Sequence, residues 1–401
     1  MMTSKQRFLT ALAGGQPDRL PVTTHWVPGY FLQKVAHLSE QEFYDRYGLD
    51  PILYLAPHLP DPARGEYFDP DQGEIGFLES RRIASDQWRV RREDLPGHEY
   101  PATRWSFVTP KGSLSMVLES DRYSSWVVEP LVKAKRDIEL IGEFCTAPLC
   151  DVAAVNRAAA EFGERGLVRS YVCCFDIFGQ PGTWQDATCL AGTEAMILAT
   201  FDDPGWVHEF LTILQRRKQV YLESMAGARF DLLELGGGSA SSSVISPGIF
   251  DTFVAPYDAA LIQTAHRHAQ RIAYHTCGGM MPLLERIAAM QPDAMETFTP
   301  PAMGGDADLA AARRRIPRDI CMIGGFDQYH HFVGCSPAQT RREVRRCFDD
   351  AGRDGGYILS PSDQFFEADP ALLAAFGDEA HRCTYAGEVP ATTATTAALA
   401  G

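Results

Sequence analysis

The sequence predicts an α/β protein whose strands and helices form a (β/α)8 barrel. Beyond about residue 167, short apolar runs typical of buried strands alternate with longer helical runs. This order is typical of a parallel sheet with right-handed crossovers. Two strand-like runs precede this region and bring the predicted strands to eight, the number of a closed barrel. A doubly wound open sheet is the alternative, but no Gly-x-Gly-x-x-Gly motif follows the first strand to hold a dinucleotide.

The N-terminal elements are marked by capping and turn residues. A first helix stops at a glycine pair, and a second begins with Ser39 and Glu42, which fit a capping box. In chain order we expect a helix at 4–14, a strand at 19–24, a helix at 39–47 and a strand at 50–55.

The segment between about residues 73 and 130 has a different texture. It is rich in charges, Trp and Tyr, and the turn signal at 109–112 separates two β-rich runs, 104–108 and 113–118. We therefore expect a β-rich insertion. Its simplest role is a lid or an oligomer contact, and whether the chain forms a homo-oligomer is left open.

The rest of the chain supplies six strands and the helices between them. The predicted strands are 167–175, 231–235, 272–275, 294–298, 320–323 and 357–359. The helices between them are expected at 192–226, 247–269, 281–290, 306–315 and 336–351. A last helix at 371–385 closes the fold, so residues 1–387 form one domain, and 388–401, mostly Ala and Thr, is predicted to be a disordered tail.

Composition excludes several classes of protein. The chain has 37 Lys and Arg against 52 Asp and Glu, and its net charge of -15 opposes binding to nucleic acid or to an anionic membrane. No apolar run reaches the length of a transmembrane helix, and no secretory signal begins the chain. The ten cysteines are scattered, which favours reduced thiols and a cytoplasmic protein.

The motif around which the chain is organised is Tyr274-His-Thr-Cys-Gly-Gly279. If residues 272–275 form a buried strand, His275 and Cys277 lie on the same side at its carboxyl end. Imidazole and thiolate are ligands that zinc takes, and catalytic zinc sites keep one position open. The alternative is a satisfied core histidine beside a small buried cysteine, because two ligands do not make a site.

Other polar residues collect at the predicted carboxyl ends of the strands, where barrel enzymes carry their chemistry. They are His25, Trp26, Cys173, Cys174, Asp176, Glu234, Gly236–Gly238, Glu296, Asp327, Ser360, Ser362 and Asp363. Two of them, Glu296 and Asp363, converge on the His-x-Cys pair if the barrel is correct. Glu296 could instead fix the tautomer of His275, and Asp363 could merely cap a turn.

We expect the substrate to contact four of these residues, Trp26, Asp176, Glu234 and Gly237. The three glycines after the 231–235 strand could bind a phosphate on their amides. They lack the Lys and Ser/Thr of a P-loop, so close approach of a substrate or a neighbouring strand is favoured.

Three motifs together resemble the uroporphyrinogen decarboxylase superfamily. They are His275-Thr-Cys-Gly278, Pro300-Pro-Ala-Met-Gly-Gly-Asp-Ala-Asp-Leu309 and Gly355-Gly-Tyr-Ile-Leu-Ser360. Within it, the chain is most similar to the zinc-dependent, corrinoid-linked methyltransferases that handle methanol, methylamines and aryl methyl ethers. The 109–112 turn, Ser246-Pro247 and Pro256-Tyr257 fit the same branch, and the similarity runs from about residue 4 to 385.

The resemblance implies a (β/α)8 barrel with zinc on His275 and Cys277, and a carboxylate ligand at the position of Glu296. It also implies cobalamin on a separate corrinoid protein, since this chain has no cobalamin-binding signature of its own. One departure concerns the family's second zinc cysteine, because Asp363 stands where that cysteine would lie. Residues 21–29 also lack the arginine-rich loop that holds porphyrinogen carboxylates, which argues against haem biosynthesis.

These observations favour a methyltransferase or demethylase that moves a methyl group between a small substrate and a corrinoid or thiol partner. His25 and Asp363 are the candidates for moving the proton, and Asp363 in place of a thiolate makes the metal harder. The alternative is a carboxy-lyase acting on a small carboxylated substrate. A third hypothesis is a catalytically silent barrel, since a lost ligand is one way such proteins arise.

Overall fold

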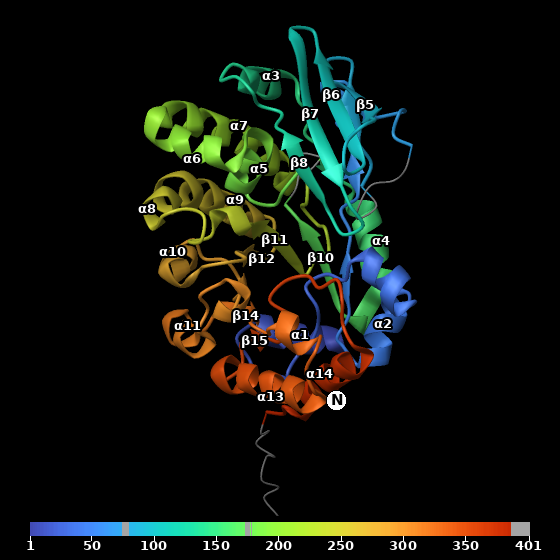
Figure 1. Ribbon diagram of the computed structural model, residues 1–401, viewed down its shortest axis with the longest axis vertical. Coiled ribbons are helices and arrows are strands. Elements are labelled where there is room, and N and C mark those ends of the chain that lie inside the picture. Colours follow the sequence, from blue (N-terminus) through green and yellow to red (C-terminus); the bar gives the residue numbers. More distant parts are fainter. Residues whose placement is uncertain (74–79, 173–176, 178, 386–401) are drawn as a thin grey trace, which may run out of the picture.

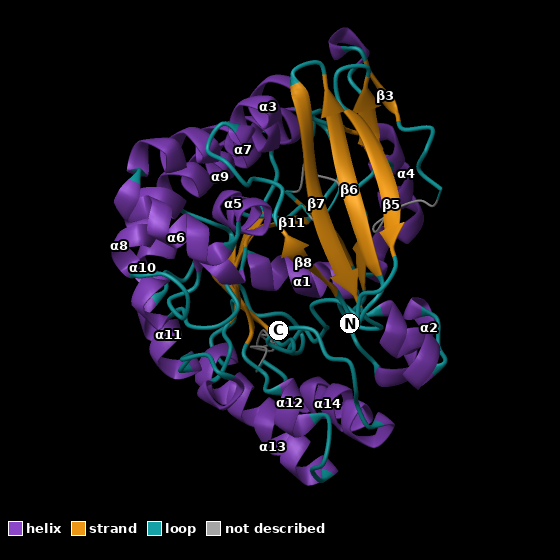
Figure 2. Cartoon of the chain, turned by 45° about the horizontal axis from the view of Figure 1, so that its top comes forward, coloured by secondary structure: helices purple, strands orange, loops and turns teal. Residues whose placement is uncertain are grey.

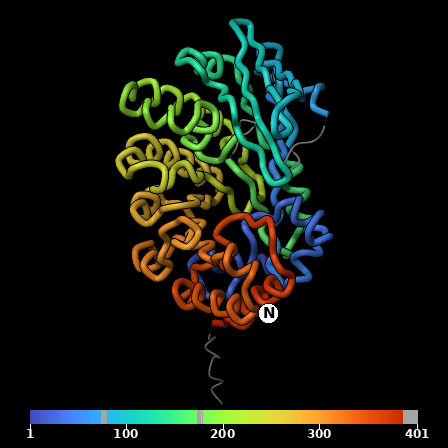
Figure 3. Tube along the Cα trace, in the orientation of Figure 1, coloured from blue at the N-terminus to red at the C-terminus, as the bar shows by residue number. Residues whose placement is uncertain are grey.

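The computed structural model describes residues 1–73, 80–172, 177 and 179–385. Its centre is a curled parallel sheet of seven strands in the order β1-β10-β11-β12-β13-β14-β15. The strands are β1 (Ile52–Tyr54), β10 (Leu167–Tyr171), β11 (Leu232–Gly236), β12 (Ile272–His275), β13 (Ala294–Thr297), β14 (Cys321–Gly324) and β15 (Tyr357–Ile358). Each strand pairs with the next one along the chain, so the α/β class and the strand order agree with the sequence prediction. Figure 3 shows the successive units following one another from green to red.

The predicted first strand at 19–24 is the one strand of this series that does not form. Val22 makes only an isolated parallel bridge to Leu359, and its carbonyl accepts a hydrogen bond from the backbone N–H of Asp50. Pro21 has no N–H to give a ladder, and the N–H of Val22 donates to the Asp50 side chain at 3.0 Å instead. The segment nevertheless lies between β15 and the residues that lead into β1.

Helices cover the outside of the sheet, and α5 to α11 line one flank in Figure 1. They are α1 (Ser4–Leu12), α2 (Glu40–Tyr47), α3 (Asp137–Phe144), α4 (Val152–Phe162), α5 (Thr183–Ala191), α6 (Thr193–Asp202), α7 (Pro204–Glu223), α8 (Pro247–Ile249), α9 (Ala255–Arg267), α10 (Leu284–Ala289), α11 (Leu309–Arg315), α12 (Gln328–His331), α13 (Pro337–Cys347) and α14 (Pro370–Arg382). The prediction of one helix at 192–226 is wrong. Gly192, at φ 92°, separates α5 from α6, and Asp203-Pro204 ends α6 and caps α7.

A separate four-stranded antiparallel sheet stands beside the central sheet, and its three longer strands are seen side by side as long arrows in Figure 2. Its strands are β5 (Arg89–Leu95), β6 (Ala102–Thr109), β7 (Gly112–Ser120) and β8 (Ser125–Glu129). The predicted 109–112 turn joins β6 to β7. Two short antiparallel pairs extend the β structure beyond the predicted 73–130 segment. In one, β2 (His58–Leu59) before it pairs with β9 (Leu149–Cys150) after it; in the other, β3 (Glu66–Phe68) before it pairs with β4 (Ile83–Ser85) within it. Residues 74–79, like the predicted tail at 388–401, lie outside the described residues.

The β7–β8 turn touches the segments that carry two candidate site residues. The Tyr123 ring lies 5.0 Å from that of Tyr30 and 4.9 Å from that of Phe366. Tyr30 follows His25 by five residues, and Phe366 follows Asp363 by three. The antiparallel sheet is therefore in contact with the rim of the candidate site.

The amino-terminal end of the central sheet is filled by apolar side chains and by α1. Phe8 and Leu12 of α1 pack in one buried cluster with strand residues. The strand residues of this cluster include Ile52, Leu167, Leu232, Ala273, Ala294, Cys321, Ile323 and Ile358. Helix α1 thus covers this end of the curled sheet with an apolar core, and the buried polar side chains of the strands lie toward the other end.

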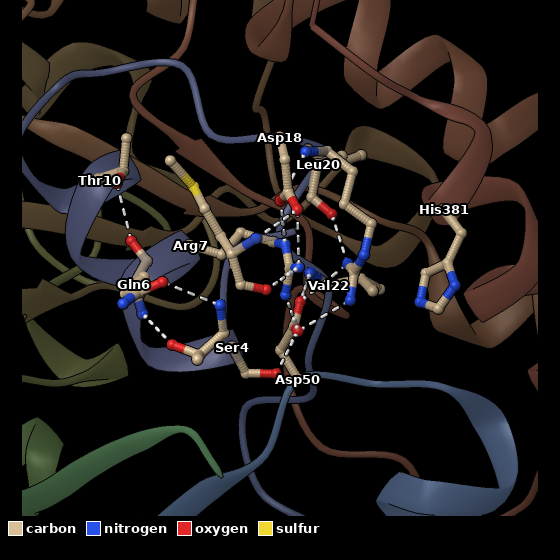
Figure 4. A network of polar contacts seen from close by, with 12 residues as sticks. Ser4, Gln6, Arg7, Thr10, Asp18, Leu20, Val22, Asp50 and His381 are labelled. Atoms are coloured by element: carbon tan, nitrogen blue, oxygen red, sulfur yellow. Dashed lines mark hydrogen bonds and ion pairs between the residues drawn. The ribbon is translucent and has the colours of Figure 1, made fainter. Parts of the chain in front are cut away.

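A buried ionic network ties α1 to the Val22 segment (Figure 4). The Asp50 side chain is fully buried and accepts from Arg7 Nη1 at 2.7 Å and from Arg19 Nη2 at 2.9 Å. Arg7 also pairs with Asp18 at 2.8 Å. One carboxylate therefore fixes two arginines and the N–H of Val22.

Replacing Asp50 by asparagine is expected to lower the free energy of unfolding by about 3 kcal/mol, because two guanidinium groups would lose their buried counter-ion. Urea unfolding followed by circular dichroism measures the change. Asp18→Asn is the matched control and should cost less, since the Asp18 side chain is about a quarter exposed, at 26%. Equal stability of the Asp50 variant and the wild type would contradict this role.

Among the described residues, no helix combines the length and the apolar character that crossing a membrane requires.

Candidate metal centre

The site is built by the alternation of side chains along four neighbouring strands. The residues two positions after Leu167, Leu232, Ala273 and Ala294 of the apolar layer are Arg169, Glu234, His275 and Glu296. Side chains two apart on a strand point to the same face, so these four form the next layer toward the carboxyl ends. The register pairs His275 directly with Glu296. All four side chains are buried.

Arg169 holds the two carboxylates of this layer. Its Nη2 lies 3.0 Å from Glu296 Oε1, its Nη1 lies 3.3 Å from Glu296 Oε2, and its Nη2 is 3.5 Å from Glu234 Oε2. The fork of the guanidinium matches the planar carboxylate of Glu296, which is the geometry that makes Arg suitable for buried pairs.

Two histidines face the same carboxylates. His275 Nδ1 lies 3.4 Å from Glu296 Oε1 and 3.5 Å from Glu234 Oε1. His25 lies with Nδ1 3.9 Å from Glu296 Oε1 and Nε2 3.7 Å from Glu234 Oε2. The two imidazole rings are 5.0 Å apart. The candidate proton carrier His25 is thus brought beside the His275 of the His-x-Cys motif.

Burial and the mutual charges shift the pKa values in this layer. Burial raises the pKa of Glu234 to about 8 and lowers the pKa of His25 to about 4. Burial alone would raise the pKa of Glu296, but the Arg169 guanidinium together with His275 and His25 outweighs burial and holds that pKa well below its usual value. For His275, burial is outweighed by Glu234, Cys277 and Glu296, which raise its pKa.

A second set of donors lies at the strand mouth, where His275, Cys277 and Asp363 meet. One ligand atom from each lies within 4.8 Å of those of the other two. His275 is buried, whereas Cys277 and Asp363 are half-buried. His275 and Cys277, the pair predicted from their spacing, therefore meet Asp363 at the end of the strand.

The glycines after β11 allow this approach. A Cβ on Gly236 would lie 2.4 Å from the carbonyl oxygen of His275, and one on Gly238 would lie 2.6 Å from Cys277 Sγ. Gly237 donates its N–H to the His275 carbonyl at 2.8 Å. The glycines thus let the neighbouring strand β12 and the Cys277 thiol come close to the backbone of this run. This arrangement is not that of a P-loop.

The remaining predicted residues are placed as follows. Trp26 is half-buried beside His25. Asp176, Cys173 and Cys174 lie outside the described residues. Asp327 caps α12 by accepting from the N–H of His330, and Ser362 bonds Gln328.

The alternative that Asp363 merely caps a turn concerns the segment before the last helix, and the N-cap of that helix is Asp369. Asp369 caps α14 by accepting from the Ala371 N–H, and within the described part of the chain Asp363 accepts from the N–H of its neighbour Gln364 at 2.7 Å. The Asp363 carboxylate therefore remains available to the strand mouth.

Sequence reasoning missed Arg169. It stands inside a run that reads as an apolar strand, and a charged residue there would ordinarily be taken as facing solvent. The signal that could have found it is its phase with Leu167, because residues two apart share a face.

Comparison with known proteins agrees with this architecture. The model of the family described as uroporphyrinogen decarboxylase (URO-D) matches residues 179–383, just over half of the chain. A solved methyltransferase from Methanosarcina mazei is similar in fold, with a TM-score of 0.58 and 15% identity over 95% of this chain and 99% of that one. A B12-independent methionine synthase from a Shewanella species has a TM-score of 0.35 and 10% identity over 91% of this chain and 95% of that one. No curated protein sequence matches the chain. The extent of the family match shows that this chain belongs to the uroporphyrinogen decarboxylase family.

Proposed function

We propose that this protein is a zinc-dependent methyltransferase or demethylase that moves a methyl group between a small substrate and a corrinoid or thiol partner. The observation that carries the proposal is the meeting of His275, Cys277 and Asp363 donors at the mouth of the sheet. The proposal includes a closed (β/α)8 barrel. In it the Val22 segment occupies the position of the eighth strand, and the antiparallel sheet is an insertion at the rim.

The donor set fits zinc. Around a tetrahedral zinc ion, nitrogen, sulfur and oxygen donors lie about 3.4–3.8 Å apart, and donors within 4.8 Å of one another reach this arrangement by small side-chain movements. Three protein ligands leave the fourth position to a substrate, which is the arrangement of catalytic zinc sites. Sulfur with imidazole suits zinc better than magnesium or calcium.

A zinc ion bound there would act as a Lewis acid that makes a coordinated hydroxyl or thiol more acidic and a better methyl acceptor or leaving group. The chain's own residues supply the rest. Gly238 has no side chain, and this leaves room for the sulfur of Cys277. His25, beside Glu234 and Glu296, is the residue to which we assign acceptance of the substrate proton.

The alternative, a carboxy-lyase, needs a cation to bind a substrate carboxylate. The central buried cation of the described site, Arg169, is already engaged by Glu296 and Glu234. This contact supports methyl transfer over decarboxylation, because a substrate carboxylate would have to compete with two fixed carboxylates for one guanidinium.

The test offers the zinc-loaded protein methanol, methylamines and aryl methyl ethers with free cob(I)alamin, and separately with a small thiol. Methylcobalamin or a methyl thioether is the expected product for at least one donor. Release of carbon dioxide from a small carboxylate, with no methyl transfer in any combination, would move the protein to the lyase class.

Asp363 should decide which acceptors the site prefers. Asp363→Ala is expected to lose most of its zinc, whereas Asp363→Cys should retain zinc and shift preference from oxygen toward thiol substrates, because a second thiolate softens the metal. Metal analysis and the acceptor panel measure both effects. Asp369→Ala, which removes a nearby helix cap, is the matched control. Zinc content and preference unchanged in both Asp363 variants would exclude it as a ligand.

A further inference from the structure

We propose that the barrel holds a second metal position, deeper than the zinc position, formed by His25, Glu234, His275 and Glu296. One ligand atom from each of these four buried residues lies within 4.8 Å of those of the other three. The ion it takes is a divalent first-row transition metal. The inference rests on the proposed function only in that the two positions share His275.

The distances between these groups are those of a coordination shell and not of hydrogen bonds. The four imidazole-to-carboxylate separations are 3.4, 3.5, 3.7 and 3.9 Å. Nitrogen-to-oxygen hydrogen bonds in proteins lie at about 2.7–3.2 Å. Donors at about 2.0–2.1 Å from a tetrahedral ion are roughly 3.4 Å apart.

Two of the donor atoms make no hydrogen bond among the described residues. These are His275 Nδ1 and Glu234 Oε2, on side chains only 7% and 4% exposed. Buried polar atoms are almost always satisfied, because an unsatisfied one costs about 1–3 kcal/mol. If Glu296 served only to orient His275, Nδ1 would donate to it, and at 3.4 Å it does not. An ion between the groups would satisfy both atoms.

Arg169 leaves part of the two carboxylates open to an ion. Glu234 and Glu296 bring two carboxylates into the interior, and Arg169 is the guanidinium that faces them both. Arg169 contacts Glu296 through Nη1 and Nη2. Glu296 Oε1 also faces His275 and His25.

The donor chemistry separates the two positions. The deeper set offers two imidazoles and two carboxylates without sulfur, which suits iron, cobalt, manganese or zinc. The outer set contains Cys277 and favours the thiophilic ions. A metal in the deeper position would coordinate His25, and a coordinated His25 could not accept a proton. The proton transfer assigned to His25 therefore applies to protein that carries only the zinc ion.

Cobalt(II) is the probe that distinguishes the positions. Metal-free protein is loaded with Co²⁺, desalted, and analysed for bound metal and for absorption. We expect two equivalents in the wild type, with the near-ultraviolet band of cobalt bound to a thiolate. Cys277→Ser should retain one equivalent and lose that band. Glu234→Gln should retain one equivalent together with the band.

His25→Gln is the second variant of the deeper set and should behave as Glu234→Gln does. Glu379→Gln changes a buried glutamate on α14, away from the site, and should bind as much cobalt as the wild type does. Circular dichroism confirms that each variant is folded. One equivalent in the wild type together with the thiolate band, or two equivalents in both deeper variants, would overturn the second position. Absence of the thiolate band from the wild type would instead contradict the zinc position of the proposed function, so the two failures are distinguishable.

Discussion

Replacing Cys277 by alanine is expected to remove zinc from the strand mouth and to lower methyl transfer by about a thousandfold or more. Cys277 is the sulfur donor that meets His275 and Asp363, and its loss leaves two ligands. A catalytic metal contributes several kcal/mol to transition-state stabilisation. Each change of about 1.4 kcal/mol in the activation free energy changes the rate tenfold. Metal analysis and the turnover of the zinc-loaded protein measure the two effects.

Cys335→Ala is the control for this substitution, because it removes a half-buried thiol from a loop far along the chain from the His-x-Cys motif. It should leave zinc content and turnover unchanged. A Cys277 variant with full zinc content and full activity would show that the thiol is only a packing residue.

Replacing Arg169 by methionine is expected to lower the free energy of unfolding by about 3–5 kcal/mol, because Glu296 and Glu234 would then be buried without their cation. The side chains of Arg169 and Glu296 are only 2% and 1% exposed, so water cannot take over the role of the guanidinium. Methionine keeps most of the volume, which confines the change to charge and hydrogen bonding. Urea unfolding followed by circular dichroism gives the difference.

The double variant Arg169→Met with Glu296→Gln tests the cause. If the loss comes from an unpaired carboxylate, the double variant should be more stable than the sum of the two single changes predicts. Additive losses, or an Arg169 variant as stable as the wild type, would contradict a stabilising ion pair.

Much of the fold was predictable because the chain repeats one pattern of strand and helix. β11 to β15 stand where apolar runs predicted them, as do β1 and β10. The failures lie where side chains or single backbone conformations override the pattern. The Asp50 carboxylate takes the N–H that would have paired Val22 in a ladder, and Asp203-Pro204 divides the predicted 192–226 helix into α6 and α7.

The candidate site was predictable where the motif is local and not where it depends on packing. His275 and Cys277 share a face because they are two residues apart, and this is visible in the sequence. The register that sets Glu296 opposite His275 could be anticipated only from strand order. Arg169 contacts Glu296 across 127 positions of sequence, and no local signal encodes such a contact.

Anomalous diffraction from crystals of the zinc-loaded protein, collected on both sides of the zinc absorption edge, tests the zinc centre most directly. We predict a zinc peak between His275, Cys277 and Asp363, within bonding distance of Cys277 Sγ at about 2.3 Å. Crystals of fully loaded protein with no anomalous peak at these three side chains would contradict the account.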